Sequence, residues 1–157
     1  LYVNSHDNGM LLRMVKSTRG GLPYRTQGQG SPNSRFWDEN KYPCQKPPWG
    51  RLTAVHTATG DIPWQVPLGV TDALPAGKQL TGRPLLAGAI STASGLLFIA
   101  ATDDNRFRAL DAKTGKELWV ATLEKRGNAN PVTYATRGGK QYVAIVASDT
   151  LVTYALR

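Results

Sequence analysis

Polar side chains that could contact a ligand gather in one short segment of the chain. Asp103, Asp104, Asn105 and Arg106 follow the apolar run 96–101 after a single threonine. Carboxylate, amide and guanidinium groups at the end of a buried strand can bind a polar ligand, or they can cap the strand and pair with one another. The sequence leaves both interpretations open, and all four residues are possible ligand contacts.

Two further candidates lie near the start of the chain. Asn4 stands where the repeat described below has Ala100. A polar amide in place of a buried alanine needs a hydrogen-bond partner, which can be backbone or a ligand. His6 lies next to Asp7 in the loop expected after Asn4, and it is the second candidate.

No complete catalytic or metal-binding constellation is present. The histidines are His6 and His56, and neither is spaced from the other or from Cys44 as a metal site requires. His56 fills the place in a turn that Asp111 fills in the second copy of the repeat, so a structural role is expected. We therefore predict no catalytic residue and no metal ligand in this chain.

An internal repeat indicates which elements position these residues. Segment 52–64 returns as segment 107–119, with every position displaced by 55 residues. A period of this size is typical of an array of like structural units. The identical pairs are Ala54/Ala109, Thr59/Thr114, Gly60/Gly115 and Trp64/Trp119.

Each unit is expected to contain about four β-strands. A strand, a Thr-Gly turn and a second strand that ends in the tryptophan form the repeated segment, because glycine permits the backbone of a tight turn. The remaining strands are expected at 84–92 and 96–101, with parts of flanking units at 1–4, 141–146 and 151–156. Four-stranded units at this spacing are the blades of a β-propeller.

The predicted fold is therefore all-β: about two full four-stranded blades plus parts of flanking blades, in one partial propeller domain over 1–157. Propellers close with four to eight blades, so we expect the chain to be a piece of a larger ring. Residues 16–50, rich in Gly, Pro and Ser, are expected to form a loop insertion within a blade. The candidate residues fall on the loop face that carries this insertion, whereas the Thr-Gly turns lie on the opposite face.

Composition limits the choice of partners. The chain has 19 Lys and Arg against 11 Asp and Glu, but the basic residues form no run of four, so no nucleic-acid partner is expected. The longest apolar stretch is far shorter than the ~20 residues that span a bilayer. Any membrane association is expected to come only through parts of the protein that this chain does not contain.

Several segments together resemble the carboxy-terminal part of quinoprotein dehydrogenases, in the branch of the membrane-type glucose dehydrogenases that depend on pyrroloquinoline quinone (PQQ). The proline-cysteine segment and the Ala-Thr-Asp-Asp-Asn-Arg loop are the features specific to that branch. The similar segments are Pro43–Val55, Trp64–Gly69, Thr92–Ala109 and Gly139–Val143.

The resemblance implies an eight-bladed periplasmic propeller that holds PQQ and a calcium ion, whose ligands lie mostly outside this chain. It implies oxidation of a sugar or alcohol hydroxyl, with hydride transfer to the quinone and a quinone or cytochrome as electron acceptor. The catalytic aspartate belongs upstream, in the remaining blades, so the fragment is expected to be inactive alone. Among cofactor contacts, the family's asparagine maps onto Asn4.

One alternative and one departure accompany this resemblance. Propellers with similar Trp-ending repeats also serve as non-enzymatic scaffolds or binding modules in outer-membrane assembly, although the insertion argues against that function. The chain also departs from the resemblance at 147–150, where relatives carry a glycine-rich loop and Ala147 and Thr150 are here separated by only two residues.

Overall fold

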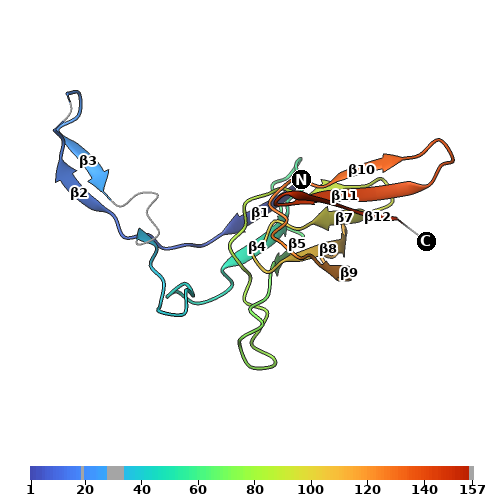
Figure 1. The fold of residues 1–157 in the computed structure, drawn as a ribbon, viewed down its shortest axis with the longest axis horizontal. Helices are drawn as coiled ribbons and strands as arrows, with labels where there is room; N and C mark the ends of the chain where they lie inside the picture. Colours follow the sequence, from blue (N-terminus) through green and yellow to red (C-terminus); the bar gives the residue numbers. More distant parts are fainter. Residues whose placement is uncertain (19, 28–33, 156–157) are drawn as a thin grey trace. The chain divides into compact units, whose positions relative to one another are not determined.

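The computed structural model describes residues 1–18, 20–27 and 34–155. The chain forms two compact units, which we call the blade unit (Leu1–His6 with Pro47–Arg157) and the insertion unit (Asp7–Lys46). Every regular element in the described ranges is a β-strand (Figure 1). Those ranges contain no helix that is long and apolar enough to cross a membrane.

The blade unit contains three antiparallel sheets. The first has the order β1-β4-β5, formed by Tyr2–His6, Gly50–Ala54 and Trp64–Pro67. The second has the order β6-β7-β8-β9, formed by Ile90–Ser91, Leu96–Ile99, Arg106–Asp111 and Glu117–Thr122. The third has the order β10-β11-β12, formed by Val132–Ala135, Gln141–Ala147 and Thr150–Ala155. These sheets are propeller blades that do not close into a ring, which confirms the all-β partial propeller; one of the three has four strands.

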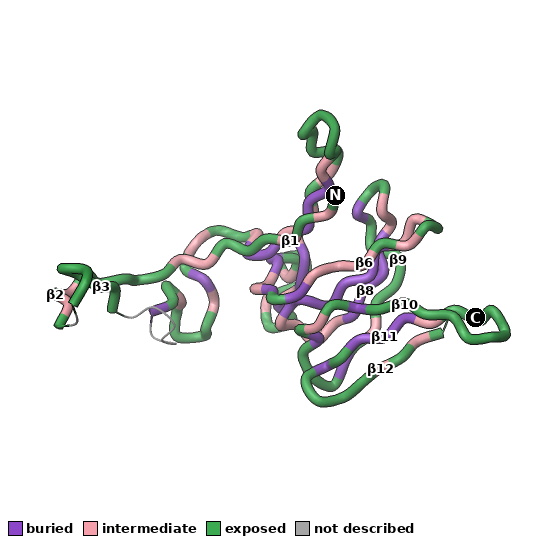
Figure 2. Tube along the Cα trace, turned by 90° about the horizontal axis from the view of Figure 1, so that it is seen from above, coloured by how far each residue is buried: buried purple, intermediate pink, exposed green. Residues whose placement is uncertain are grey.

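The middle sheet is buried on both faces because its side chains alternate between two cores. Leu97 and Ile99 pack in a cluster with Leu52 of the first sheet. Phe98, between them in sequence, packs in a second cluster with Ile145 of the third sheet. Figure 2 shows this burial along β8. The apolar run 96–101 was expected to be a buried strand, and the structure confirms this for Leu96–Ile99; Ala100 and Ala101 are also buried but follow the end of the strand.

The repeated tryptophans lie at a different place in their strands from the one expected. Trp64 begins β5 and Trp119 lies within β9, whereas both were predicted to end a strand. The reason is the antiparallel register, in which Trp64 pairs with Ala54 and Trp119 with Ala109, close to the turn. After the tryptophan, β5 continues along β4, and β9 continues along β8.

The inner strand of the middle sheet is also shorter than expected. The segment 84–92 forms only the two-residue β6, together with an isolated bridge between Leu85 and Thr102. Asparagine side chains form hydrogen bonds with backbone groups that a longer β6 would need for pairing with its neighbouring strand. Asn4 Nδ2 donates to Ala87 O at 2.5 Å, and Gly88 N donates to Asn130 Oδ1 at 2.6 Å.

Tryptophan also links the first two blades. Trp64 Nε1 donates to Ala112 O at 3.2 Å, and Tyr2 Oη donates to the same carbonyl at 2.9 Å. The Trp64 ring covers Gly115 in the Thr-Gly turn of the second blade, where a Cβ would lie 2.7 Å from Cε3 of the ring. The repeated glycine therefore permits both the turn and the close approach of the tryptophan.

The insertion unit is a segment between the paired strands β1 and β4. It contains the hairpin of β2 (Arg13–Lys16) and β3 (Tyr24–Gln27) and two isolated bridges, Met10 with Arg35 and Trp37 with Pro43. The expected insertion at 16–50 overlaps this unit, but β2 begins before residue 16 and Gly50 already belongs to β4. The domain bounds remain a prediction.

The two Thr-Gly turns provide a matched pair of substitutions. Gly60 and Gly115 both have positive φ, at 82° and 72°, but no atom lies within 4 Å of a Cβ built on Gly60. Gly60→Ala should lower the free energy of unfolding by about 1 kcal/mol, through backbone strain alone. Gly115→Ala should cost a further ~1–3 kcal/mol, because its methyl group would overlap Trp64. Urea denaturation followed by circular dichroism measures both, and equal losses would contradict the packing of Trp64 on this turn.

Candidate functional site

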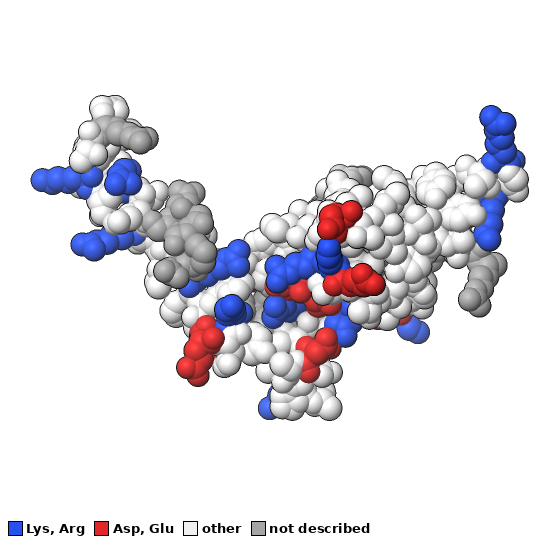
Figure 3. Space-filling model, in the orientation of Figure 1, with Lys and Arg blue, Asp and Glu red and all other residues white. Residues whose placement is uncertain are grey.

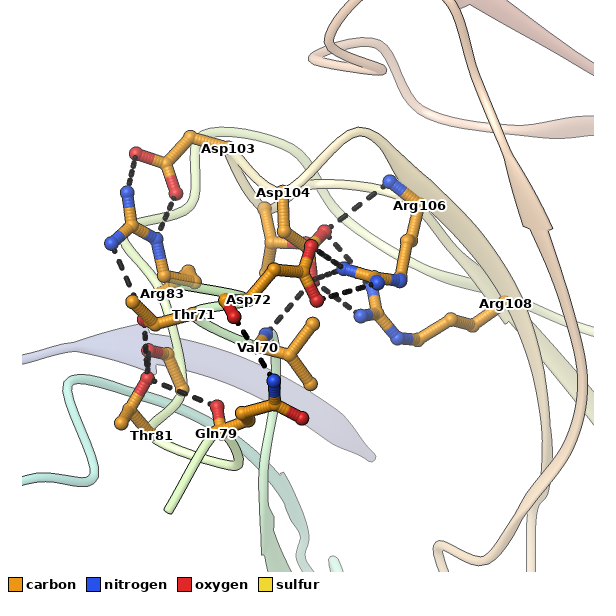
Figure 4. A network of polar contacts seen from close by, with 12 residues as sticks. Val70, Thr71, Asp72, Gln79, Thr81, Arg83, Asp103, Asp104, Arg106 and Arg108 are labelled. Atoms are coloured by element: carbon orange, nitrogen blue, oxygen red, sulfur yellow. Dashed lines mark hydrogen bonds and ion pairs between the residues drawn. The ribbon is translucent and has the colours of Figure 1, made fainter. Parts of the chain in front are cut away.

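A network of ion pairs and hydrogen bonds joins two loops of the blade unit. One loop connects β5 to β6, and the other connects β7 to β8; of the four polar residues singled out in the sequence, the second loop contains Asp103, Asp104 and Asn105, and Arg106 begins β8. In Figure 3 acidic and basic side chains interleave near the middle of the view, and Figure 4 shows the network from close by. Both loops belong to the face on which the sequence places a site.

Asp104 is the centre of this network. Its side chain is 2% exposed, and Arg108, whose side chain is 3% exposed, forms an ion pair with it. Asp104 Oδ1 also accepts hydrogen bonds from Thr102 Oγ1 at 2.6 Å and from Arg106 N at 3.2 Å. Asp104 Oδ2 accepts one from Val70 N at 2.9 Å, which attaches the β5–β6 loop to the β7–β8 loop.

The electrostatics of Asp104 follow from this surrounding. Burial by itself raises the pKa of the Asp104 carboxyl, because the charged form loses hydration. The hydrogen bonds and positive charge of Arg108, with the bonds from Thr102 and Val70, outweigh burial and hold the pKa below its ordinary value. Asp104 is therefore an anion, and both of its carboxylate oxygens already accept hydrogen bonds from the protein, so neither is left for a ligand.

Arg108 is satisfied in the same way. Its Nε donates to Glu117 Oε2 at 3.0 Å, and its Nη1 donates to Thr102 Oγ1 at 3.2 Å. Arg108 lies in β8, in register with Ile99 and Val120, between the buried apolar residues Phe107 and Ala109. An arginine buried in this position would be costly without Asp104.

A second ion pair fixes the residue before Asp104. Arg83 binds Asp103 through two parallel hydrogen bonds, from Nε to Oδ1 at 2.7 Å and from Nη2 to Oδ2 at 2.9 Å. Arg83 is positioned by close backbone packing, since a Cβ on either Gly50 or Gly82 would overlap the backbone of the opposite segment. This bidentate geometry is the strongest form of carboxylate binding by arginine.

The outermost pair of the network is Arg106 with Asp72. Arg106 donates from Nη2 to Asp72 Oδ1 at 2.9 Å and from Nη1 to Oδ2 at 3.1 Å. The hydrogen bonds from Asp72 raise the pKa of Arg106 above its ordinary value. Asn105, between the two charged residues, has φ at 56° and donates no side-chain bond within the described residues; its carbonyl accepts from Leu123 N at 2.7 Å.

Asn4 and His6 lie apart from this network, on β1. His6 was expected in a loop after Asn4, but the strand continues and His6 pairs with Gly50 of β4. Asn4 pairs with Leu52, whose counterpart in the repeat is Phe107. Ile99 pairs with Arg108, so the next position, Ala100, falls beside Phe107. The predicted equivalence of Asn4 and Ala100 therefore agrees with the register. The Asn4 amide nitrogen is bound to Ala87 O, and no described group donates to its Oδ1. His6 Nδ1 donates to Leu85 O at 3.0 Å. Both side chains therefore bind the backbone segment that precedes β6.

The described residues offer little for metal binding or for catalysis on their own. Over 1–18, 20–27 and 34–155, no three His, Cys, Asp or Glu side chains gather closely enough to hold a metal ion. A cavity of about 1230 Å³ lies between the second and third sheets, beside the turn that joins β6 to β7. It is lined by aliphatic, aromatic and hydroxyl side chains and by the amide of Gln141, with no charged group, and it lies at the end of the sheets that carries the Thr-Gly turns.

One half of the network was predicted from the sequence and the other half was not. Asp103, Asp104 and Arg106 were singled out as possible ligand contacts, and the structure brings them together as partners in ion pairs; ligand contact remains a prediction. Their partners were missed, namely Asp72, Arg83 and Arg108. Arg108 carried a signal, because an arginine between Phe107 and the apolar pair Ala109 and Leu110 needs a buried carboxylate.

The stacked antiparallel sheets, joined by loops that carry polar residues at one end, define a β-propeller. The family model "Glucose/ethanol/alcohol dehydrogenase, beta-propeller domain", a PQQ family, matches residues 6–143. The chain belongs to this family of PQQ-dependent dehydrogenases, which are oxidoreductases, and this confirms the resemblance seen in the sequence.

Curated relatives support the same assignment. A probable quinate dehydrogenase (quinone) of Xanthomonas campestris pv. juglandis is 41% identical over 85% of this chain and 18% of its own length. A quinate/shikimate dehydrogenase (quinone) of Acinetobacter baylyi is 33% identical over 99% of this chain and 23% of its own. The quinoprotein glucose dehydrogenase of Escherichia coli is 36% identical over 87% and 18%. The chain thus spans about a fifth of the length of these relatives.

Solved structures share the fold. A europium-containing methanol dehydrogenase superposes with a TM-score of 0.54 at 23% identity, over 92% of this chain and 22% of that one. The quinohemoprotein alcohol dehydrogenase of Comamonas testosteroni gives a TM-score of 0.50 at 28% identity, over 69% and 14%. The first of these likenesses shows the propeller fold alone.

The Asp104 carboxylate allows a test of the network by mutation and pH. Asp104→Asn leaves Arg108 buried without its counter-ion, so the free energy of unfolding at pH 7 should fall by about 3 kcal/mol. Because the folded pKa is depressed, the stability that Asp104 contributes is present above its unfolded pKa of about 3.9 and is lost as pH falls through the folded value. Denaturation measured from pH 7 to pH 2 should therefore show a flatter acid limb for the variant.

Asp149→Asn is the matched control for this experiment. Hydrogen bonds from Lys125 lower the pKa of Asp149 too, but both side chains are exposed at the surface. Removal of the Asp149 charge should leave the free energy of unfolding at pH 7 unchanged within error. Equal losses in the two variants would contradict a special role for the buried pair.

Proposed function

We propose that this chain supplies three neighbouring blades to a PQQ-dependent dehydrogenase that oxidises a hydroxyl group of a sugar or alcohol, cyclic polyols included. The observation that carries the proposal is the match of the family model to residues 6–143, which reaches from β1 into the third sheet. The names of the relatives support the substrate class, since quinate, shikimate, glycerol and glucose all carry hydroxyl groups. No observation favours the alternative of a non-enzymatic scaffold.

One side-chain atom of β1, Asn4 Oδ1, is available to bind a polar cofactor. Asn4 Oδ1 accepts no hydrogen bond from a described residue, while the amide nitrogen is held by Ala87 O. The side chain is therefore oriented by the backbone and keeps an acceptor available. PQQ, when bound, would take up the hydride from the hydroxyl-bearing carbon, and Asn4 would hold a donor group of the cofactor in place.

The charged loops would have a supporting role in this enzyme. Asp103 and Asp104 are engaged by Arg83 and Arg108, so they hold the loop face in shape for the cofactor and substrate. His6, Asn105 and Arg106 remain proposed contacts at that face. We assign no catalytic residue and no metal ligand to this chain; a calcium or lanthanide ion would be held by other blades.

The surroundings of the enzyme are proposed from the same relatives. The names of both quinate dehydrogenases include quinone, which supports a quinone as electron acceptor; a cytochrome is the second candidate. The periplasm is the proposed location. The partners of this chain would then be the remaining blades, the hydroxyl-bearing substrate and the acceptor.

The incomplete site predicts that the isolated chain is inactive. The purified 157-residue chain, supplied with PQQ and either calcium or a lanthanide, should reduce no redox dye in the presence of glucose, glycerol or quinate. The physical reason is that the proposed base and metal ligands lie elsewhere. Dye reduction above the level of a protein-free control would contradict the proposal that the base and the metal ligands lie outside this chain.

Asn4 can be tested in the complete dehydrogenase that contains this chain. Asn4→Ala should weaken PQQ binding about tenfold, which corresponds to the ~1.4 kcal/mol of one lost hydrogen bond to the cofactor. Titration of the apoenzyme with PQQ, read by recovered activity and by tryptophan fluorescence, measures the shift. Ser5→Ala, at the next position of β1, should leave the titration unchanged.

The same variants separate cofactor binding from folding. Asn4→Ala also removes the bond to Ala87 O, so unfolding of the apoenzyme should be measured alongside. A variant that loses stability but titrates with PQQ like the unaltered enzyme would show that Asn4 serves the fold alone.

A further inference from the structure

The β2–β3 hairpin exposes large apolar side chains. Leu22, in the connection between the two strands, is 75% exposed. Met14 on β2 and Tyr24 on β3 are also exposed, as are Leu11 and Leu12 just before β2. Single exposed apolar residues are ordinary, but several on one small element usually indicate an interaction surface.

The same hairpin is strongly basic. Between residues 13 and 27 the sequence has four arginines and lysines and no aspartate or glutamate. Arg13, Lys16 and Arg25 are exposed on the paired strands, and no described carboxylate forms an ion pair with them. On the face seen in Figure 3, the hairpin carries blue side chains and no red ones.

The register of the hairpin mixes these two properties on both faces. Lys16 pairs with Tyr24 and Val15 pairs with Arg25, so each face has a cation beside an apolar or aromatic side chain. Lysine and arginine beside tyrosine and leucine are the residues that suit the boundary between lipid headgroups and acyl chains. A nucleic-acid surface would match the charge but would leave Leu22 and Met14 in water.

We propose that the β2–β3 hairpin binds the surface of a bilayer that contains anionic phospholipids. The basic side chains would contact phosphate groups, and Leu22, Met14 and Tyr24 would enter the headgroup boundary. Strands of four residues are too short to cross a bilayer, which needs about nine to eleven, so the hairpin lies on the membrane. This attachment lies within the chain, whereas the sequence placed any membrane association outside it.

Vesicle binding by the full chain tests the electrostatic part. The chain should sediment with vesicles of one-third phosphatidylglycerol in phosphatidylcholine, more weakly at high salt, and should bind pure phosphatidylcholine far less. Lys16→Gln with Arg25→Gln should weaken binding about 25-fold, since each basic residue near an anionic surface contributes about fivefold. Lys78→Gln with Lys113→Gln removes the same charge from exposed sites of the blade unit and should change binding little.

A second matched pair tests the apolar part. Leu22→Ser should weaken vesicle binding about tenfold, as expected when a leucine is partly withdrawn from lipid. Leu86, which is 77% exposed on the blade unit, provides the control, and Leu86→Ser should bind like the unaltered chain. Circular dichroism checks that every variant keeps its β-structure.

Three results would overturn the proposal. They are absence of binding to the anionic vesicles, equal losses in the hairpin and control variants, and capture of a single-stranded oligonucleotide by a chain that ignores vesicles. The last result would assign the basic hairpin to nucleic acid. Losses confined to the hairpin variants support the membrane surface.

Discussion

The buried ion pair between Asp104 and Arg108 is the interaction on which the loop face of the blade unit depends. Two charged groups that are almost fully buried cost much free energy to dehydrate, and only good geometry with additional hydrogen bonds offsets that cost. Here Thr102, Val70 and Glu117 provide those bonds. The long β5–β6 loop is thereby attached to the β7–β8 loop through the Val70 amide, and the Arg83–Asp103 pair repeats the attachment one residue away. The loop face is held by polar contacts, whereas the blades beneath it are held by apolar packing.

The internal repeat explains why the blades could be recognised before their loops. Positions shared by both copies, such as Ala54, Gly115 and Trp64, build contacts between neighbouring strands or blades, so each leaves the same trace in the sequence at the same spacing. Positions that differ between copies carry what is particular to one blade. Asn4 in place of Ala100 is the clearest example, because the register aligns them while only the asparagine reaches a carbonyl of the next blade.

The parts that the sequence could not predict depend on pairing over long distances. Asp72 and Arg106 are separated by 34 residues, and no periodicity connects them. Arg83 could not be recognised as the partner of Asp103, because its position depends on two glycine backbones that pack together in three dimensions. The short β6 was missed for a similar reason, since the side chains of Asn4 and Asn130 take the backbone groups that local propensity assigns to a strand. Strand β7, in contrast, could be predicted from the apolar composition of the run 96–101 alone.

The balance of charge in the network bears on how a cofactor would be held. Asp72, Asp103, Asp104 and Glu117 face Arg83, Arg106 and Arg108, so the cluster is close to neutral and each charge already has a partner. Such a cluster fixes geometry without imposing a strong field on a ligand above it. An available acceptor such as Asn4 Oδ1 then has more influence on the orientation of a bound cofactor than several charges that are already paired. Selectivity at this face is accordingly expected to come from directed hydrogen bonds held on a rigid frame, which is how preorganised sites act without reorganising at the moment of reaction.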